Sequence, residues 1–174
     1  MNSKLFNFLF LTFIFFGQQV MAHDHIEKFG TAKEAKELLE RTINLVKSNE
    51  TVAFAMITAG QGGLRNKDLY PFCTTMNGIM IAHPFISGTD MSNFKTSDGV
   101  KVADVMLKNA KEGKISKITY KLNRTGNTQD KEFKKTTFYT KVKKYVCASG
   151  YYSEWFLFRR HLELNSKLKK LKYR

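Results

Sequence analysis

Residues 69–84 read LYPFCTTMNGIMIAHP, and this stretch predicts a β-hairpin. Asn77-Gly78 stands between two apolar runs, which is the strongest short-range hairpin signal, because a type I′ turn needs positive φ at both central residues. His83-Pro84 ends the second run, and a residue before proline is pushed towards extended geometry. We therefore expect His83, a titratable ring, at a strand end where a sensing or binding pocket can begin.

The first 22 residues have the pattern of a secretory signal. Lys4 supplies a positive charge, Leu5–Phe16 is an almost unbroken apolar run, and Val20-Met21-Ala22 has the small-residue end of a cleavage site. We expect cleavage after Ala22. The alternative is an uncleaved anchor, although a run of about a dozen apolar residues is short for a bilayer span of roughly 20. Cleavage would place the protein in a bacterial periplasm or outside the cell.

Three segments are expected: the signal peptide at 1–22, one domain at 23–152, and a basic, helical or solvated extension at 153–174. No segment after the signal is apolar enough to cross a membrane. Lysine and arginine outnumber aspartate and glutamate by 29 to 15, which gives a net charge of +14. This balance favours anionic partners such as acidic proteins, lipid head groups or acidic small ligands. Export and the lack of a recognised motif argue against nucleic acid.

Helical and strand patterns succeed one another after residue 30. Thr31-Ala32-Lys33-Glu34 is a capping box that begins an amphipathic helix reaching about Asn49, and a second helical stretch follows at 52–57. Ser97-Asp98-Gly99 opens another helix, which we expect Asp98 to cap and Gly113 to end. Alternation predicts three further strands at 115–122, 133–142 and 144–152, the last two joined by a tight Lys143-Lys144 corner. This order predicts an α+β domain around one antiparallel sheet.

The chain has two cysteines, Cys73 and Cys147, and both fall in predicted strands. In an oxidising compartment a pair this sparse forms one structural disulfide, or else stays as two buried thiols that pack like small hydrophobic side chains. Neither cysteine has the spacing of a metal ligand. The sequence leaves both alternatives open.

Taken together, these residues resemble the single-Cache family of extracytoplasmic sensor domains. The resemblance is carried by Gly30-Thr31 with Glu34-Ala35, Leu69-Tyr70, Asn77-Gly78, Ala82-His83-Pro84, Gly88, Asp98-Gly99, Tyr120, Phe138-Tyr139 with Lys141, and 147–151. It implies a PAS-like antiparallel sheet of about five strands, with a long N-terminal helix and a crossover helix on it. A small ligand would lie between the sheet and its covering loop and helix, and known ligands of such domains include small carboxylates.

The chain departs from the receptor pattern in two ways. No transmembrane helix or output module follows the sheet, so it looks like a free-standing version of the domain. The tryptophan that often precedes the aromatic residue of the third strand is missing, and Ile118 is near that place.

Six residues are candidate ligand-binding groups: His83, Tyr120, Tyr139, Lys135, Lys141 and Asp98. The imidazole and the two ammonium groups suit a carboxylate, and the tyrosines can bury a ring while the hydroxyl reaches a polar partner. Each has a structural alternative. His83 can fix the His-Pro turn by a hydrogen bond to a loop carbonyl, the tyrosines can be core, the lysines can be solvated, and Asp98 can be only a helix cap.

The two ends of the mature chain suggest further contacts. Cleavage after Ala22 would leave His23-Asp24-His25, whose amine, amides and imidazole can hold Cu(II) or Ni(II); an ordinary frayed terminus is the alternative. Residues 153–174 can form a basic helix that docks on an anionic membrane or partner, or a solvated extension.

The sequence therefore predicts an extracytoplasmic module that binds a small anionic metabolite and signals through a separate membrane-bound partner. The alternative is a non-catalytic envelope scaffold that uses the sheet and the basic tail, and a homodimer through the first helix fits either function. We expect no enzyme activity and no cofactor, because the sequence contains no nucleophile elbow, phosphate-binding glycine loop, His-Glu-x-x-His or Cys-x-x-Cys motif.

Overall fold

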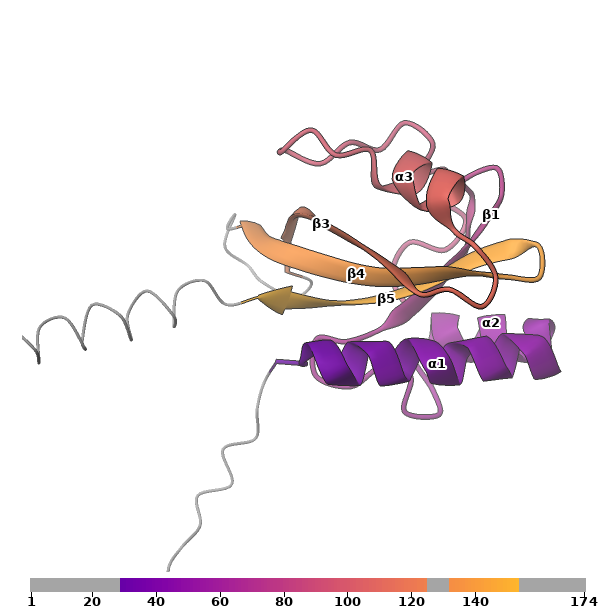
Figure 1. Cartoon of the computed structure of the whole chain (residues 1–174). Coiled ribbons are helices and arrows are strands. Elements are labelled where there is room, and N and C mark those ends of the chain that lie inside the picture. The colour runs from indigo at the N-terminus through magenta and orange to yellow at the C-terminus, as the bar shows by residue number, and fades with distance from the viewer. Residues whose placement is uncertain (1–28, 125–131, 154–174) are drawn as a thin grey trace, which may run out of the picture.

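The computed structural model describes residues 29–124 and 132–153, and it contains one five-stranded antiparallel sheet with the strand order β2-β1-β5-β4-β3 (Figure 1). The strands are β1 (Pro71–Thr75), β2 (Met80–Ala82), β3 (Ser116–Asn123), β4 (Glu132–Val142) and β5 (Tyr145–Ser153). The helices are α1 (Ala32–Ser48), α2 (Glu50–Ala59) and α3 (Val102–Asn109). The predicted α+β class and the single antiparallel sheet are confirmed.

The sheet separates two layers of helix. Helices α1 and α2 cover one face, while α3 and the long loop before it lie on the other (Figure 1). The core on the α1 side includes Leu39, Val46 and Ile57, which are almost fully buried. The core on the α3 side includes Tyr70, Met106 and Tyr120. Because successive strand residues point to opposite faces, β4 and β5 contribute to both cores, whereas β3 contributes only to the α3-side core.

Helix α1 begins as the sequence predicts. The backbone N–H of Thr31 donates to Glu34 Oε2 at 2.8 Å, and the Glu34 N–H donates to Thr31 Oγ1 at 3.2 Å, which is a complete capping box. The second helical stretch is a separate helix, because Asn49 ends α1 and its side chain caps α2 by accepting from the Val52 N–H at 3.1 Å.

The first hairpin forms, but its turn is not the predicted type I′ turn. Gly78 has a φ of 84°, whereas Asn77 is not among the residues with positive φ. The Gly78 N–H donates to the Thr75 carbonyl at 3.1 Å, and the Thr75 N–H donates to the Ile79 carbonyl at 2.9 Å. This pattern fits a type I turn followed by a left-handed glycine, which is a common three-residue hairpin loop. Asn77 therefore needs no positive φ.

Helix α3 is shorter than predicted, and Asp98 does not cap it. The cap position is Lys101, which makes no side-chain capping bond, and the helix ends at Asn109 rather than at Gly113. Asp98 instead accepts from the Thr96 hydroxyl at 2.6 Å and from the Lys121 N–H at 3.1 Å. Its carboxylate thus organises the turn that precedes α3 and ties this turn to β3.

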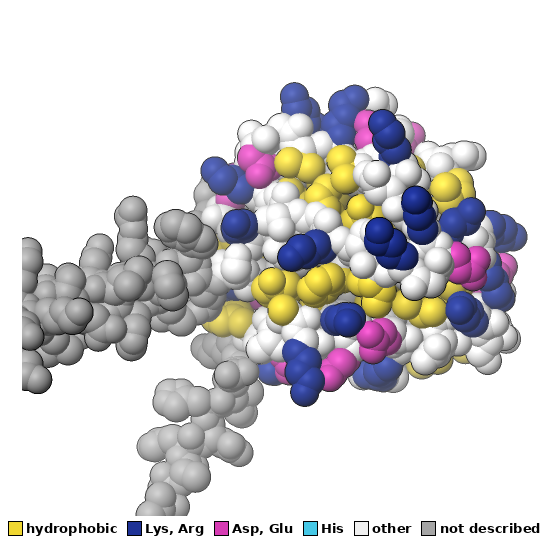
Figure 2. All heavy atoms as spheres, viewed as in Figure 1, with side chains coloured by type: hydrophobic (Ala, Val, Ile, Leu, Met, Phe, Trp, Pro, Cys, Tyr) yellow, Lys and Arg dark blue, Asp and Glu magenta, His cyan; other side chains and the backbone are white. Residues whose placement is uncertain are grey.

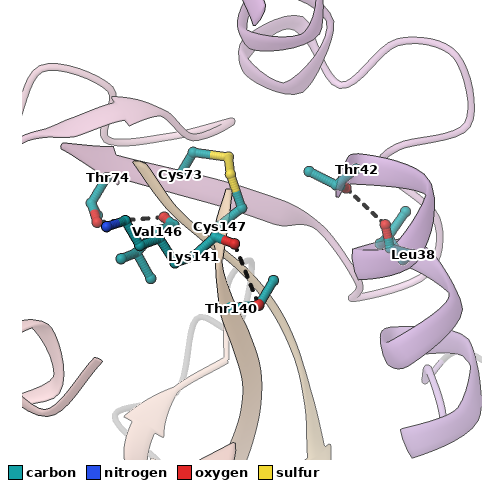
Figure 3. Close-up of a disulfide and its surroundings, with 8 residues drawn as sticks. All are labelled: Leu38, Thr42, Cys73, Thr74, Thr140, Lys141, Val146 and Cys147. Atoms are coloured by element: carbon teal, nitrogen blue, oxygen red, sulfur yellow. Dashed lines mark hydrogen bonds between the residues drawn. A yellow bond between two sulfur atoms is a disulfide. The ribbon is translucent and has the colours of Figure 1, made fainter. Parts of the chain in front are cut away.

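Cys73 and Cys147 form a disulfide between the neighbouring strands β1 and β5 (Figure 3). The two residues are direct partners in the antiparallel register and both are fully buried. They belong to the core on the α1 side of the sheet. The disulfide alternative is therefore the correct one.

Several predictions concern residues outside the described ranges. These are the signal segment, the His23 and His25 metal site, and the basic extension after Ser153. Within residues 29–124 and 132–153, no helix combines the length and apolar character that a membrane span requires.

Candidate ligand-binding site

A cavity of about 470 Å³ lies between the sheet and the α3 layer. Its size is typical of sites for small molecules. Its lining consists of Tyr70, Phe72, Thr74, Met80, His83, Phe85, Ile86, Thr89, Met91, Phe94, Val102, Ala103, Met106, Tyr120, Leu122, Asn123 and Lys135. The cavity is thus placed where a ligand is expected in the family that the sequence resembles.

The wall of the cavity is mainly apolar and comes from both layers. Strands β1 and β3 supply aromatic and aliphatic side chains from the sheet, while α3 supplies Val102, Ala103 and Met106. Phe85 and Ile86, in the loop after β2, also line the cavity although they are 42% and 39% exposed. These two side chains therefore mark its mouth.

Lys135 is the charged side chain in this lining, and it is almost completely buried, with 2% of its surface exposed. It lies on β4, where its register partners are Tyr120 on β3 and Tyr152 on β5. Its Nζ donates to the Tyr70 hydroxyl at 2.8 Å and lies 4.4 Å from the centre of the Tyr70 ring. A second ring, that of Tyr152, is 4.9 Å from Nζ. The ammonium group is therefore held among aromatic rings.

Gly150 on β5 leaves the space that the lysine side chain occupies. A Cβ atom at this position would lie 2.5 Å from Thr137 Oγ1, 2.9 Å from the Thr136 carbonyl and 3.1 Å from Lys135 Cε. Any larger residue would push the lysine stem or its neighbours aside. Gly150 is therefore a positioning residue for Lys135.

Lys135 keeps its charge in spite of burial. Burial lowers the pKa of Lys135, but the oxygens of the surrounding tyrosines Tyr70, Tyr120 and Tyr152 raise it by more, so the pKa lies above that of an ordinary lysine. Burial also raises the pKa of Tyr152 to about 12, so this phenol is neutral at neutral pH. Within the described chain no carboxylate lies in ion-pair reach of Lys135. The described part of the cavity therefore contains a cation without a matching anion, which is costly unless a ligand supplies one.

His83 holds the mouth of the cavity through its Nδ1 atom. Nδ1 accepts from the backbone N–H groups of Phe85 at 3.0 Å and Ile86 at 3.3 Å. The Ser87 hydroxyl donates to the His83 carbonyl at 2.8 Å and accepts from the His83 N–H at the same distance. His83 thus has the structural role that the sequence offers as an alternative, because its ring fixes the turn after Pro84. The partners of the ring are amide N–H groups and not the expected loop carbonyl.

The ring of His83 is neutral at neutral pH. Burial and the nearby Lys135 charge lower the pKa of His83 from 6.5 to about 4. Because Nδ1 accepts hydrogen bonds, the neutral ring carries its hydrogen on Nε2. The described residues provide no acceptor for this Nε2–H, and His83 lines the cavity, so the group is available to a ligand.

The other four candidate residues divide into one that lines the cavity and three that do not. Tyr120 lines it, and its hydroxyl shares a hydrogen bond of 2.9 Å with Thr137 Oγ1. Tyr139 is 3% exposed and packs in the α3-side core beyond the cavity wall, and burial raises its pKa. Lys141 and Asp98 are also absent from the lining. Asp98 contributes instead to a shallow polar hollow with Lys121, Glu132 and Lys134.

Sequence reasoning missed most of the apolar wall. Phe72 and Met80 lie in the predicted hairpin, and their alternation with Cys73 and Ile81 could have assigned them to one face of the sheet. Met91 and Phe94 lie in a loop, where no periodic pattern shows which side chains turn inward. The described residues contain no cluster of three or more histidine, cysteine, aspartate or glutamate side chains that could hold a metal.

The fold is similar to that of solved chemotaxis and chemosensory domains. A methyl-accepting chemotaxis protein from Vibrio parahaemolyticus RIMD 2210633 matches with a TM-score of 0.56 and 19% identity, over 69% of this chain and 86% of that one. A periplasmic sensor domain of a chemotaxis protein matches with a TM-score of 0.53 and 19% identity, over 70% and 90%. A Cache chemosensory domain described for its carboxylic acid recognition matches with a TM-score of 0.51 and 20% identity, over 70% and 88%. At these identities the likeness establishes the fold.

The fold is that of a PAS-like domain, and its cavity lies between the sheet and the α3 layer. The family is given by the sequence itself, because the family described as Single Cache domain 2 matches residues 18–154. The chain belongs to this family. The match confirms the resemblance seen in the sequence, and it assigns the domain to the class of extracytoplasmic ligand sensors. No curated protein sequence matches this chain.

Proposed function

We propose that the protein binds a small carboxylate in the cavity between the sheet and α3 and passes the bound state to a membrane-bound signalling partner. The buried ammonium of Lys135 carries the proposal, because an anion is the ligand that best compensates a buried cation. The neutral Nε2–H of His83 supplies a second donor on the same cavity wall. The carboxylic acid recognition described for a structural neighbour supports the same ligand class.

Lysine and arginine side chains are spread over the face of the molecule shown in Figure 2 rather than gathered in one patch. The positive surface therefore attracts anions in general without selecting among them. Selection requires a charge in a buried site, and Lys135 is almost completely buried.

The substitution Lys135→Met tests the proposal, because methionine keeps the approximate length of the side chain and removes its charge. We expect carboxylate binding to weaken by about tenfold to a hundredfold. This range follows from the binding free energy that one hydrogen bond to a charged group contributes. The free energy of unfolding should not fall, since the substitution also removes a buried, unpaired charge. Binding of acetate, butanoate, hexanoate and succinate to the purified protein is measured by calorimetry and by thermal shift.

Lys134→Met is the matched control, because Lys134 is the exposed neighbour on the same strand. It removes the same charge from the surface and should leave carboxylate binding within about twofold, as expected for screened surface charges. If none of these acids stabilises the wild-type protein at millimolar concentration, the proposal is wrong, because a ligand of the native state must raise its melting temperature. Equal loss in both variants would also contradict it.

A further inference from the structure

The charges that line the cavity restrict its ligand more narrowly than the class of carboxylates. Among the described lining residues, Lys135 is positive, none is aspartate or glutamate, and His83 is neutral at neutral pH. Among the described residues, the cavity thus offers one positive charge and no carboxylate to pair with a ligand ammonium group. A zwitterionic amino acid would bury its ammonium without an anion, and a dicarboxylate would bury a second carboxylate without a cation.

The polar groups of the lining are concentrated on the sheet. Lys135 hydrogen-bonds to Tyr70, the Tyr70 ring is 5.0 Å from the His83 ring, and Tyr120 is the register partner of Lys135. These four residues therefore form one connected cluster, which we call the anchor cluster. Two groups of this cluster, Lys135 Nζ and His83 Nε2, can donate hydrogen bonds to a ligand carboxylate.

The opposite wall is apolar. Helix α3 supplies Val102, Ala103 and Met106, and the preceding loop supplies Met91 and Phe94. Methionine side chains adapt to irregular apolar shapes, so this wall suits a hydrocarbon body more than a hydroxylated one. A cavity of about 470 Å³ is far larger than a carboxylate group alone needs. Most of the volume therefore lies beside apolar side chains.

From these observations we infer that the ligand is a monocarboxylate with an apolar body, whose carboxylate binds the anchor cluster and whose hydrocarbon part lies under α3. The inference rests on the proposed carboxylate-binding function and adds the selection against amino acids and dicarboxylates.

A set of six-carbon ligands tests the charge selection on the wild-type protein. The set is hexanoate, norleucine, adipate, hexylamine and hexanol, which share a carbon skeleton and differ in their charged groups. We expect hexanoate to bind most tightly by calorimetry. Norleucine, adipate and hexanol should bind at least tenfold more weakly, and hexylamine should not bind, because the buried lysine repels a second cation.

A homologous series tests the apolar body. From butanoate to hexanoate to octanoate, affinity should rise about fourfold for each added methylene until the cavity is full, as follows from the transfer free energy of a buried methylene group. Ala103→Leu, which narrows the α3 wall, should weaken octanoate more than butanoate. Ala55→Leu on the exposed side of α2 is the matched control and should leave the whole series unchanged.

The outcomes separate this inference from the function on which it rests. Tighter binding of adipate, norleucine or acetate than of hexanoate overturns the inference and leaves carboxylate sensing in place. Absence of binding by every acid in both panels overturns the proposed function and the inference together. An equal effect of Ala103→Leu on butanoate and octanoate would place the hydrocarbon part away from α3 and also overturns the inference.

Discussion

A single imidazole orders the loop at the mouth of the cavity. His83 Nδ1 accepts from two successive amide groups, those of Phe85 and Ile86, and the side chains of both residues line the mouth. The ring also contacts Tyr70 and Phe72, at centroid distances of 5.0 and 5.8 Å. The neutral form of His83 therefore has a structural task that its protonated form cannot perform, because a protonated imidazole has no acceptor.

This arrangement predicts a loss of stability at acid pH. The pKa of His83 is about 4 in the native state and near 6.5 in the unfolded state, so the unfolded chain takes up the proton first. The contribution is fully present above pH 6.5 and declines as the pH falls towards 4, by up to about 3 kcal/mol in the free energy of unfolding. Urea unfolding at pH 7, 6, 5 and 4 measures the decline.

His83→Asn is the informative variant, because an asparagine oxygen can accept from the same amides and does not titrate. Its free energy of unfolding should change less than that of the wild type between pH 6.5 and 4. Glu34, whose pKa is lowered from 4.5 to about 2 mainly by its hydrogen bond to Lys67, begins to lose its contribution near pH 4.5, but it does so equally in both proteins. Parallel pH profiles for the two proteins would contradict the assignment.

At the scale of the elements, β4 and β5 cooperate to place the anchoring charge. Thr137 and Gly150 are register partners, and the absent side chain at 150 leaves room for the Lys135 stem, two residues along the same face of β4. Positioning thus depends on a residue of the neighbouring strand that does not itself line the cavity.

Gly150→Ala should therefore disturb both stability and binding. The added methyl group meets Thr137 and the Thr136 carbonyl as well as Lys135, and overpacking of this kind costs about 1–3 kcal/mol. The affinity for hexanoate should also fall, because the added methyl group displaces the Lys135 ammonium. Val46→Ala, a buried position of α1 on the opposite face of the sheet, is the control with a comparable stability loss and unchanged affinity. If both variants bind hexanoate like the wild type, Gly150 does not position the lysine.

The sequence predicts elements better than it predicts this site. Alternation in β3 assigns Ile118 and Tyr120 to the buried face correctly, since a strand has a strict period of two. The Asp-Gly step before an apolar helical pattern predicts that Asp98 caps α3, but its carboxylate accepts from the Thr96 hydroxyl two residues away and from the Lys121 N–H on β3. A local signal cannot anticipate the contact with Lys121, which is 23 residues away in sequence.

The candidate site shows the same limit. Lys135 was among the expected ligand groups, but a lysine in a basic strand gives no sign that it is buried. Its burial follows from the rings of Tyr70, which directly precedes β1, and Tyr152, which lies on β5. Met91 and Phe94 line the cavity from a loop without periodicity, so their inward orientation depends on how the whole layer packs. Sequence patterns locate the strands that carry the site. Which side chains line the cavity depends on how the sheet and the α3 layer pack together.

At the scale of the whole molecule, the disulfide ties the two ends of the sheet-forming chain together. Cys73 and Cys147 are 74 residues apart in sequence, and the enclosed segment contains α3, β3 and β4, which together build much of the cavity wall. The bond itself lies in the core on the α1 side, on the face of the sheet away from the cavity. It therefore constrains the unfolded chain strongly without contacting the ligand.

We predict that the double variant Cys73→Ala/Cys147→Ala separates stability from binding. Opening a loop of this size should lower the free energy of unfolding by about 2–4 kcal/mol, chiefly because the unfolded chain gains conformational freedom. The anchor cluster remains in place in the folded fraction, so the hexanoate dissociation constant should stay within about twofold of the wild-type value. Urea unfolding and calorimetry well below the melting temperature measure the two quantities. A large loss of affinity in the fully folded variant would show that the α1-side core determines the geometry of the cavity, because the placement of Tyr70 before β1 and of Lys135 on β4 would then depend on the covalent tie.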